Sequence, residues 1–112
     1  MVTRKINLKK IINQYSRALE EKGIKAEKII LYGSYASGRP HAGSDIDLVV
    51  ISPDLDQMHP LKKLELLSLA TAKVEAPIEA LGYSPKDIED KGQDSIFWDI
   101  VTKTGKTVYT RR

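Results

Sequence analysis

Apolar side chains recur every three or four positions near the start of the chain, and basic or amide side chains fill most positions between them. This spacing places the apolar residues on one face of a helix, and it predicts an amphipathic helix from about Lys5 to Lys22. Gly23 follows directly, and glycine commonly ends helices. The apolar face would consist of Leu8, Ile11, Ile12, Tyr15, Ala18 and Leu19.

Four short stretches have the composition of strands and are bounded by turn-forming residues. Ala26–Tyr32 stops at a Gly-Ser pair, and Asp45–Ile51 stops at a Ser-Pro pair. Pro77–Leu81 is short and mostly apolar, and Thr107–Thr110 follows Gly105. Each of the four is predicted to form a strand.

Further helices are predicted between these strands. Pro60–Val74 carries leucines at helical spacing, Ser84-Pro85 is a typical helix start, and Ser95–Lys103 has a helical pattern. Tyr35–Gly38 has room for one helical turn at most, and Arg39–Gly43 is predicted as a loop. The order of helices and strands predicts an α/β domain with one small sheet.

Two sets of apolar residues are expected in the core. One is the leucine stripe that runs from Leu61 to Leu69, with Leu64 and Leu67, and the other is on the late helix. Large apolar side chains on a helical stripe usually pack against a neighbouring layer of the fold. The members of the second set are Phe97, Trp98 and Ile100.

The chain has 112 residues and no cysteine. Its length fits one domain, residues 1–112, which can bury a core without disulfides or a structural metal. The lack of thiols excludes cysteine catalysis, thiolate zinc sites and iron–sulfur clusters, and it is consistent with a cytoplasmic protein. No apolar run approaches the roughly 20 residues of a membrane helix, and no apolar core of a secretory signal follows the basic start.

Charge is distributed unevenly around a net value of +3. Residues 1–30 carry eight basic and three acidic side chains, whereas residues 31–60 carry Arg39 and four aspartates. The basic first segment is interpreted as a solvated helix face, and the alternative is a positive surface for polyphosphate, RNA or an acidic partner. No basic motif with interleaved aromatic residues is present, so nucleic acid ranks last among the partners.

A glycine-serine turn and an acidic strand lie close together in the middle of the sequence. The first reads Gly33-Ser34-Tyr35-Ala36-Ser37-Gly38, and after five residues the second reads Ser44-Asp45-Ile46-Asp47-Leu48. Gly33 allows a sharp turn, and the backbone N–H groups and the hydroxyl that follow it suit a phosphate. Asp45 and Asp47 alternate with an apolar residue, so their carboxylates would share one strand face. Two such carboxylates suit Mg²⁺ completed by substrate phosphates and water.

In this order and spacing, the two segments resemble the motif of the nucleotidyltransferase superfamily, which includes DNA polymerase beta and kanamycin nucleotidyltransferase. The family pattern is Gly-Ser-x-Ala-x-Gly, a loop, and Ser-Asp-Ile-Asp-Leu. The resemblance is closest to the minimal nucleotidyltransferase (MNT) domains of prokaryotes, including MntA-type antitoxins, and it covers nearly the whole chain. It implies the polymerase beta-like fold, a small mixed β-sheet flanked by helices.

The resemblance implies a role for each matched residue. Gly33 and Ser34 would hold the β- and γ-phosphates of a nucleoside triphosphate, and Arg39 and Ser44 belong to the same nucleotide-binding set. Ser37 stands where many members of the family have arginine. Arg39 is therefore the one fixed positive charge of the loop, and it either serves the triphosphate or is only solvated.

The same resemblance implies a catalytic, Mg²⁺-binding set of three carboxylates, Asp45, Asp47 and Glu79. Glu79 stands where aspartate is commoner in the family, and it would help to activate the acceptor hydroxyl. Glu75 is the alternative third acid, although it fits the register less well. His41 also stands where arginine is frequent, and it is interpreted as a loop residue without a catalytic role.

The sequence thus favours an enzyme that transfers a nucleoside monophosphate, AMP from ATP, to a hydroxyl group. Because 112 residues leave no room for an acceptor-binding domain, the acceptor surface would come from a partner or a second copy of the chain. For MNT domains, the resemblance implies an antitoxin whose partner is a helical HEPN-type toxin with an acceptor tyrosine. The alternative is a non-catalytic antitoxin that neutralises its partner by binding it.

Overall fold

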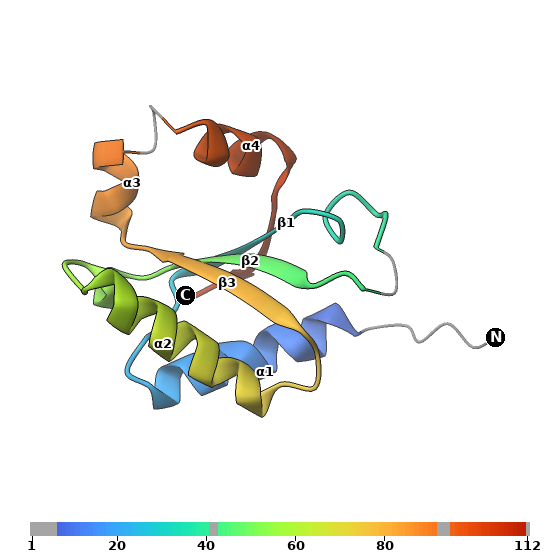
Figure 1. Ribbon diagram of the computed structural model, residues 1–112, viewed down its shortest axis with the longest axis horizontal. Coiled ribbons are helices and arrows are strands. Elements are labelled where there is room, and N and C mark those ends of the chain that lie inside the picture. Colours follow the sequence, from blue (N-terminus) through green and yellow to red (C-terminus); the bar gives the residue numbers. More distant parts are fainter. Residues whose placement is uncertain (1–6, 41–42, 92–94, 112) are drawn as a thin grey trace.

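The computed structural model describes residues 7–40, 43–91 and 95–111, which form a four-stranded sheet with helices on both faces (Figure 1). Short 3-10 turns follow β2 and α2, at Pro53–Leu55 and Thr71–Lys73. The main elements are α1 (Leu8–Glu21), β1 (Lys28–Tyr32), β2 (Ile46–Ile51), α2 (Pro60–Ala70), β3 (Ile78–Tyr83), α3 (Pro85–Lys91), α4 (Ile96–Thr104) and β4 (Lys106–Thr110).

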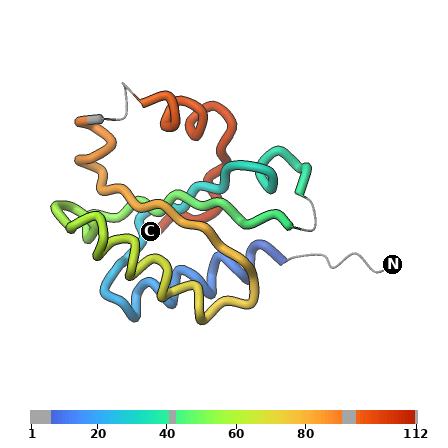
Figure 2. The backbone as a smooth tube through the Cα atoms, in the orientation of Figure 1, coloured from blue at the N-terminus to red at the C-terminus, as the bar shows by residue number. Residues whose placement is uncertain are grey.

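The strands lie in the order β3-β2-β1-β4. Strand β1 pairs antiparallel with both β2 and β4, whereas β2 pairs parallel with β3. A parallel pair needs a crossover, and Figure 2 shows the chain leaving β2, passing through α2 and returning into β3. The sheet is therefore mixed and flanked by helices, which confirms the predicted fold class.

Helix α1 forms where the apolar spacing predicts it. Asn7 caps its first turn by accepting a hydrogen bond from the Lys10 backbone N–H at 3.1 Å, and Gly23 follows its end with φ +85°. The predicted start at Lys5 lies outside the described residues. The apolar face packs with α2 and one face of the sheet into the larger core, together with Ile29, Leu48 and other buried strand residues.

Tyr15 is fully buried in this core, and its hydroxyl donates a 2.8 Å hydrogen bond to the Leu67 carbonyl of α2. We expect Tyr15→Phe to lower the free energy of unfolding by about 1–2 kcal/mol, because the bond to a buried acceptor is lost. Urea unfolding measures the change. Tyr109→Phe is the control, because among the described residues no group hydrogen-bonds to the Tyr109 hydroxyl on β4, so the change should stay below about 0.5 kcal/mol. Equal losses would contradict the prediction.

The core predicted for the leucine stripe of α2 is wrong for Leu61, Leu64 and Leu69. Leu61 and Leu64 are 70% and 55% exposed, and Leu69 is also exposed, whereas Leu67 and Ala70 are buried. The reason is the way the first half of α2 meets β3. There Lys63 is the residue that turns toward the strand, and its ammonium group donates to the Gly82 carbonyl at 3.1 Å.

The opposite face of the sheet is covered by α4, where Val49, Ile51 and Val101 form a second, smaller core. Phe97 and Trp98 pack against this cluster and are partly buried, in agreement with the prediction. Ile100 is 51% exposed, so its predicted core position is wrong. Because α4 is short and only one side of it touches the sheet, Ile100 remains on the uncovered side.

The remaining differences concern the ends of elements. Strand β3 continues to Tyr83, beyond the predicted Leu81, and the Arg39–Gly43 loop is described only in part. No helix within the described ranges is long and apolar enough to cross a membrane.

Candidate functional site

Three neighbouring strands bring one row of polar side chains onto the sheet face that α4 partly covers. In the strand register, Tyr32 of β1 is paired with Asp47 of β2, and Asp47 is paired with Glu79 of β3. Ile46 and Leu48 are fully buried on the other face, so the alternation of the strand turns Asp47 toward the α4 side. We call Tyr32, Asp47 and Glu79 the polar row.

The predicted acidic pair is placed slightly differently from the expectation. Strand β2 begins at Ile46, so Asp45 lies just before it and is exposed. The negative charge of Asp45 nevertheless acts on Asp47, and so does the charge of Glu79 on the next strand. The three predicted acids therefore surround one end of the parallel β2–β3 pair.

Gly33 lies directly against this acidic end of the sheet. Its φ is +76°, and a Cβ atom built on it would lie 2.3 Å from Oδ2 of Asp47. The chain then makes a short helical turn, in which the Gly33 carbonyl accepts from the N–H groups of Ala36 and Ser37 at 3.1 Å. The predicted turn is confirmed, and it starts at Gly33, which meets the Asp47 carboxylate; the backbone amides at the start of such a turn suit a phosphate.

Negative charge accumulates in the polar row. Burial raises the pKa of the Asp47 carboxyl above its ordinary value, and the charges of Glu79 and Asp45 raise it further. Burial likewise raises the pKa of Tyr32 to about 12, with added contributions from Asp47, Glu79 and Tyr83. The repulsion among the carboxylates would be relieved by a cation bound between them.

The donor set fits Mg²⁺. Among the described residues, no three Asp, Glu or His side chains are gathered closely enough to form a metal site by themselves. Mg²⁺ commonly uses one or two carboxylates and takes its other oxygens from water and substrate phosphates. Asp47 and its acidic neighbours supply such oxygens beside a turn that suits phosphate.

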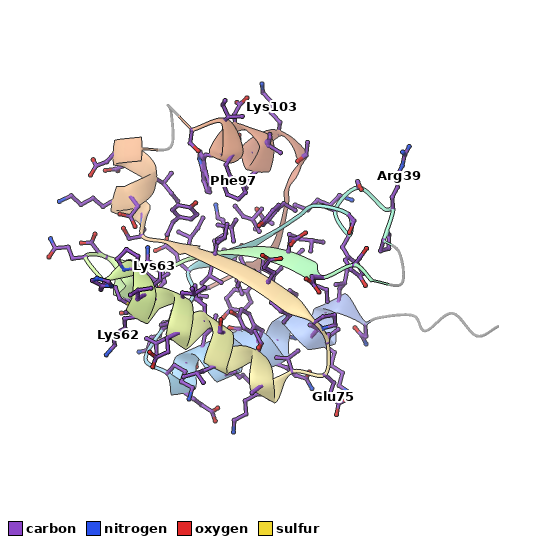
Figure 3. All side chains as sticks on the ribbon, in the orientation of Figure 1. Arg39, Lys62, Lys63, Glu75, Phe97 and Lys103 are labelled. Carbon is purple, nitrogen blue, oxygen red and sulfur yellow. The ribbon has the colours of Figure 1, made fainter. Side chains whose placement is uncertain are left out.

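The other predicted residues that the structure describes differ in their exposure. Ser44 is buried, whereas Arg39 is exposed, and Figure 3 shows the Arg39 side chain extending outward from its loop. Glu75 is exposed and precedes β3, so it has no partner in the strand register, and Glu79 takes the place beside Asp47. His41 lies outside the described residues.

Tyr32 was not predicted as a site residue, although two features of the sequence pointed to it. It directly precedes Gly33, and the alternation of β1 turns it to the same face as Asp47. Its ring meets Phe97 of α4 edge to face, with centroids 5.4 Å apart, and Figure 3 shows Phe97 pointing from α4 toward the sheet. Tyr35, by contrast, packs against the larger core.

The raised pKa of Asp47 gives a prediction for stability. A carboxyl with a raised folded pKa stabilises the fold below its unfolded pKa of about 4, and this contribution is lost as the pH rises through the folded value. Without metal at pH 7, Asp47→Asn should therefore raise the unfolding temperature, by about 1–4 °C because solvent screens this partly exposed group.

Thermal unfolding in the presence of EDTA measures this change. Asp99→Asn is the control, because Asp99 is an exposed acid that pairs with Lys103 on α4, and its loss should bring no gain. With Mg²⁺ and an ATP analogue, the wild-type chain should instead unfold at a higher temperature than Asp47→Asn, since the metal would stabilise the wild-type chain more than the variant. A lower unfolding temperature for Asp47→Asn in EDTA would contradict the prediction.

Residues 12–108 match the nucleotidyltransferase domain family. No curated protein matches the chain in a sequence search. A solved structure from Sulfolobus solfataricus that is classed as a nucleotidyltransferase shares 15% identity and a TM-score of 0.59, with 91% of this chain and 82% of that chain covered.

Two toxin–antitoxin structures have a similar fold. A chain of a toxin–antitoxin complex with AMP-PNP shares 20% identity and a TM-score of 0.62, over 89% of this chain and 73% of that one. A chain of a Shewanella oneidensis complex, in which a tri-AMPylated HEPN toxin is bound to an MNT antitoxin, shares 18% identity and a TM-score of 0.55. The match covers 88% of this chain and 69% of that chain. At these identities the likeness concerns the fold.

Proposed function

The chain belongs to the nucleotidyltransferase domain family, and we propose that it transfers AMP from ATP to a hydroxyl group of a protein partner. The observation that carries this proposal is the contact between the Gly33 turn and the Asp47 carboxylate, with Glu79 beside it. A phosphate-binding turn and metal-binding carboxylates must meet for the α-phosphate to be held for attack.

In this proposal each residue has one task. Gly33 and Ser34 bind the β- and γ-phosphates through backbone N–H groups and the serine hydroxyl. Asp45 and Asp47 would hold Mg²⁺, which would neutralise phosphate charge and favour attack at the α-phosphorus, and Glu79 beside them acts on the acceptor hydroxyl. Ser44, which is buried just before Asp45, belongs to the same nucleotide-binding set in this proposal. Arg39 is exposed on the loop, from which it would meet the outer phosphates only after reorienting.

The transfer step is a displacement at phosphorus. The acceptor oxygen forms a bond to the α-phosphorus of ATP, the bond from that phosphorus to the bridging oxygen breaks, and pyrophosphate leaves. Glu79 takes the proton from the acceptor hydroxyl. It is suited to this task because it is exposed at the edge strand of the sheet, where an acceptor can approach from solvent.

We further propose that the acceptor belongs to a HEPN-type toxin and that the chain acts as its antitoxin. Two similar folds occur in toxin–antitoxin complexes, and in one of them the HEPN toxin is AMPylated. The uncovered part of the sheet supports a protein acceptor, because Leu81 on β3 is 37% exposed on the same face as Glu79. An apolar side chain beside a catalytic acid suits contact with a partner.

Incubation with Mg²⁺, a HEPN partner and ATP labelled at one phosphate tests this function. Label at the α-phosphate should appear on the partner, whereas label at the γ-phosphate should appear in pyrophosphate. Mass spectrometry should find one added AMP per modified tyrosine. Label on the partner from the γ-phosphate would identify a kinase instead, and no transfer from either position would overturn the enzymatic proposal.

A non-catalytic antitoxin is the second candidate. It is favoured by the outward position of Arg39 and by the lack of a three-residue metal group among the described side chains. It requires that the toxin is neutralised by the complex alone. Neutralisation that survives in the double variant Asp45→Asn, Asp47→Asn would support this candidate, and its loss while the complex still forms would support the enzyme.

A further inference from the structure

Strand β3 is an edge strand of the sheet, because β2 is its only neighbour in the strand order. The carbonyls of Pro77, just before β3, and of Tyr83, its last residue, accept hydrogen bonds from the β2 side at 2.8 and 3.0 Å. Backbone groups alternate in direction along a strand, so the odd-numbered residues of β3 face β2 and the even-numbered residues face the outer edge. The outer edge therefore carries the N–H and C=O groups of Ile78, Ala80 and Gly82.

Lys63 of α2 closes one end of this outer edge. Its ammonium group donates to the Gly82 carbonyl at 3.1 Å. Lysine at a sheet edge is a common means of blocking the addition of another strand. Among the described residues, no hydrogen bond is made to the outward backbone groups of Ile78 and Ala80, and both residues are only partly buried. A short free edge is therefore left, and it lies on both sides of Glu79 in the sequence.

The side chains along this free edge suit an extended polypeptide. Glu79 and Leu81 are both exposed, and strand alternation turns them to the α4 side of the sheet. A strand that paired with Ile78 and Ala80 would place its own residues opposite these two side chains. In an antiparallel pair these are the non-hydrogen-bonded positions, at which cross-strand side chains approach most closely. Strand addition gains affinity from the main chain and specificity from such alternate side chains.

Charge decides what can occupy this edge. Figure 3 shows Lys63 near the end of β3, whereas the acids gather near its start. None of these acids has an ion pair among the described residues, and they are Asp45, Asp47, Glu75 and Glu79. Two copies of this chain paired antiparallel through Ile78 and Ala80 would place their Glu79 side chains opposite each other, which destabilises a sheet. A segment with basic residues is instead attracted to this end, so the charge favours another protein over a second copy.

We propose that the acceptor of AMP is a basic, extended segment of the protein partner, which adds to β3 as an antiparallel strand. The residue that carries the acceptor hydroxyl lies opposite Glu79, and an apolar residue two positions before it lies opposite Leu81. Basic residues flank the hydroxyl and meet the negative charge at the start of β3. This inference rests on the proposed function, because it takes Glu79 as the acid that acts on the acceptor hydroxyl, and it names the class of acceptor.

Synthetic peptides test this inference. Each has one central tyrosine with a lysine on either side, and a valine stands two residues before the tyrosine. With the full chain, Mg²⁺ and ATP labelled at the α-phosphate, kcat/KM for the peptide is measured. N-methylation of the lysine before the tyrosine removes the N–H group that would donate to the Ala80 carbonyl, so kcat/KM should fall by about 10-fold or more. N-methylation of the valine is the matched control. The valine N–H points away from β3, so the change should stay within about 3-fold.

Substitutions in the chain give a second readout. Leu81→Lys should lower kcat/KM for the valine peptide by about 10-fold, because an apolar contact is lost and a charge is added beside the basic segment. A peptide with glutamate in place of valine should recover at least about 3-fold of this loss in the variant. Leu61→Lys is the control, because Leu61 is a 70% exposed leucine of α2 outside the edge, and its effect should stay within about 2-fold. No recovery with the glutamate peptide would overturn the proposed register.

The outcomes separate this inference from the function on which it rests. If the chain transfers AMP to its folded partner but to none of the peptides, or if the two N-methylated peptides react alike, the inference fails and the proposed function stands. If the α-label reaches neither the partner nor any peptide, both fail. A loss confined to the peptide methylated directly before the tyrosine supports the inference.

Discussion

Asp47→Asn is expected to reduce AMP transfer by about 10³-fold or more, the largest loss expected from any single side chain of the site. Asp47 touches the position where a Gly33 Cβ would lie, and it stands between the phosphate turn and Glu79. An amide keeps the shape of the carboxylate but loses its charge, so binding of Mg²⁺ and neutralisation of the phosphates are both lost. Initial rates with labelled ATP and the HEPN partner measure the effect.

Asp99→Asn is again the control, because it removes one carboxylate from an exposed i,i+4 ion pair with Lys103 on α4. Such pairs contribute little to stability, so transfer should remain within about 2-fold of the wild-type rate. Complex formation with the toxin should survive in both variants, because the side-chain shape of Asp47 is kept. Transfer by Asp47→Asn at more than a tenth of the wild-type rate would contradict its assignment as a metal ligand.

The part of the site that follows from the sequence is the part that depends on local backbone rules. Strand alternation turns Asp47 to the sheet face opposite to that of the buried Ile46 and Leu48, and a glycine after a strand allows the turn at Gly33. These rules act over a few residues, so they are visible in the sequence. The position of Glu79 beside Asp47 could not be predicted from such local rules, because it depends on the parallel pairing of β2 with β3 across the α2 crossover. The family resemblance supplied that prediction.

The errors have a common physical origin in tertiary contacts. Helical spacing predicts that Leu61 and Leu64 share a face with Leu67, but it cannot predict that β3 meets α2 through Lys63. Ile100 is exposed for the same kind of reason, since α4 meets the sheet on only one side. The position of Tyr32 beside Asp47 also needed the assembled sheet, because its neighbours Asp47, Glu79 and Phe97 come from three other elements.

Gly33→Ala is expected to reduce transfer strongly while leaving the chain folded. The substitution has two separate costs at this position. A φ of +76° is unfavourable for alanine by about 1–2 kcal/mol. The new Cβ would also lie 2.3 Å from Oδ2 of Asp47 and 3.2 Å from its Cγ. The carboxylate can rotate away at little cost to the fold, but it then no longer faces the phosphate turn. We expect a loss of transfer of at least about 10²-fold.

Gly38→Ala separates the two costs. Gly38 has nearly the same φ, +75°, but a Cβ built on it would have no atom within 4 Å. Both variants should therefore lose about the same free energy of unfolding, roughly 1–2 kcal/mol from the backbone alone. Only Gly33→Ala should lose transfer and the stabilisation by Mg²⁺ with an ATP analogue, whereas Gly38→Ala should keep both within about 3-fold. Equal losses of transfer in the two variants would mean that the glycines act through loop flexibility, and the contact between Gly33 and Asp47 would then have no special role in catalysis.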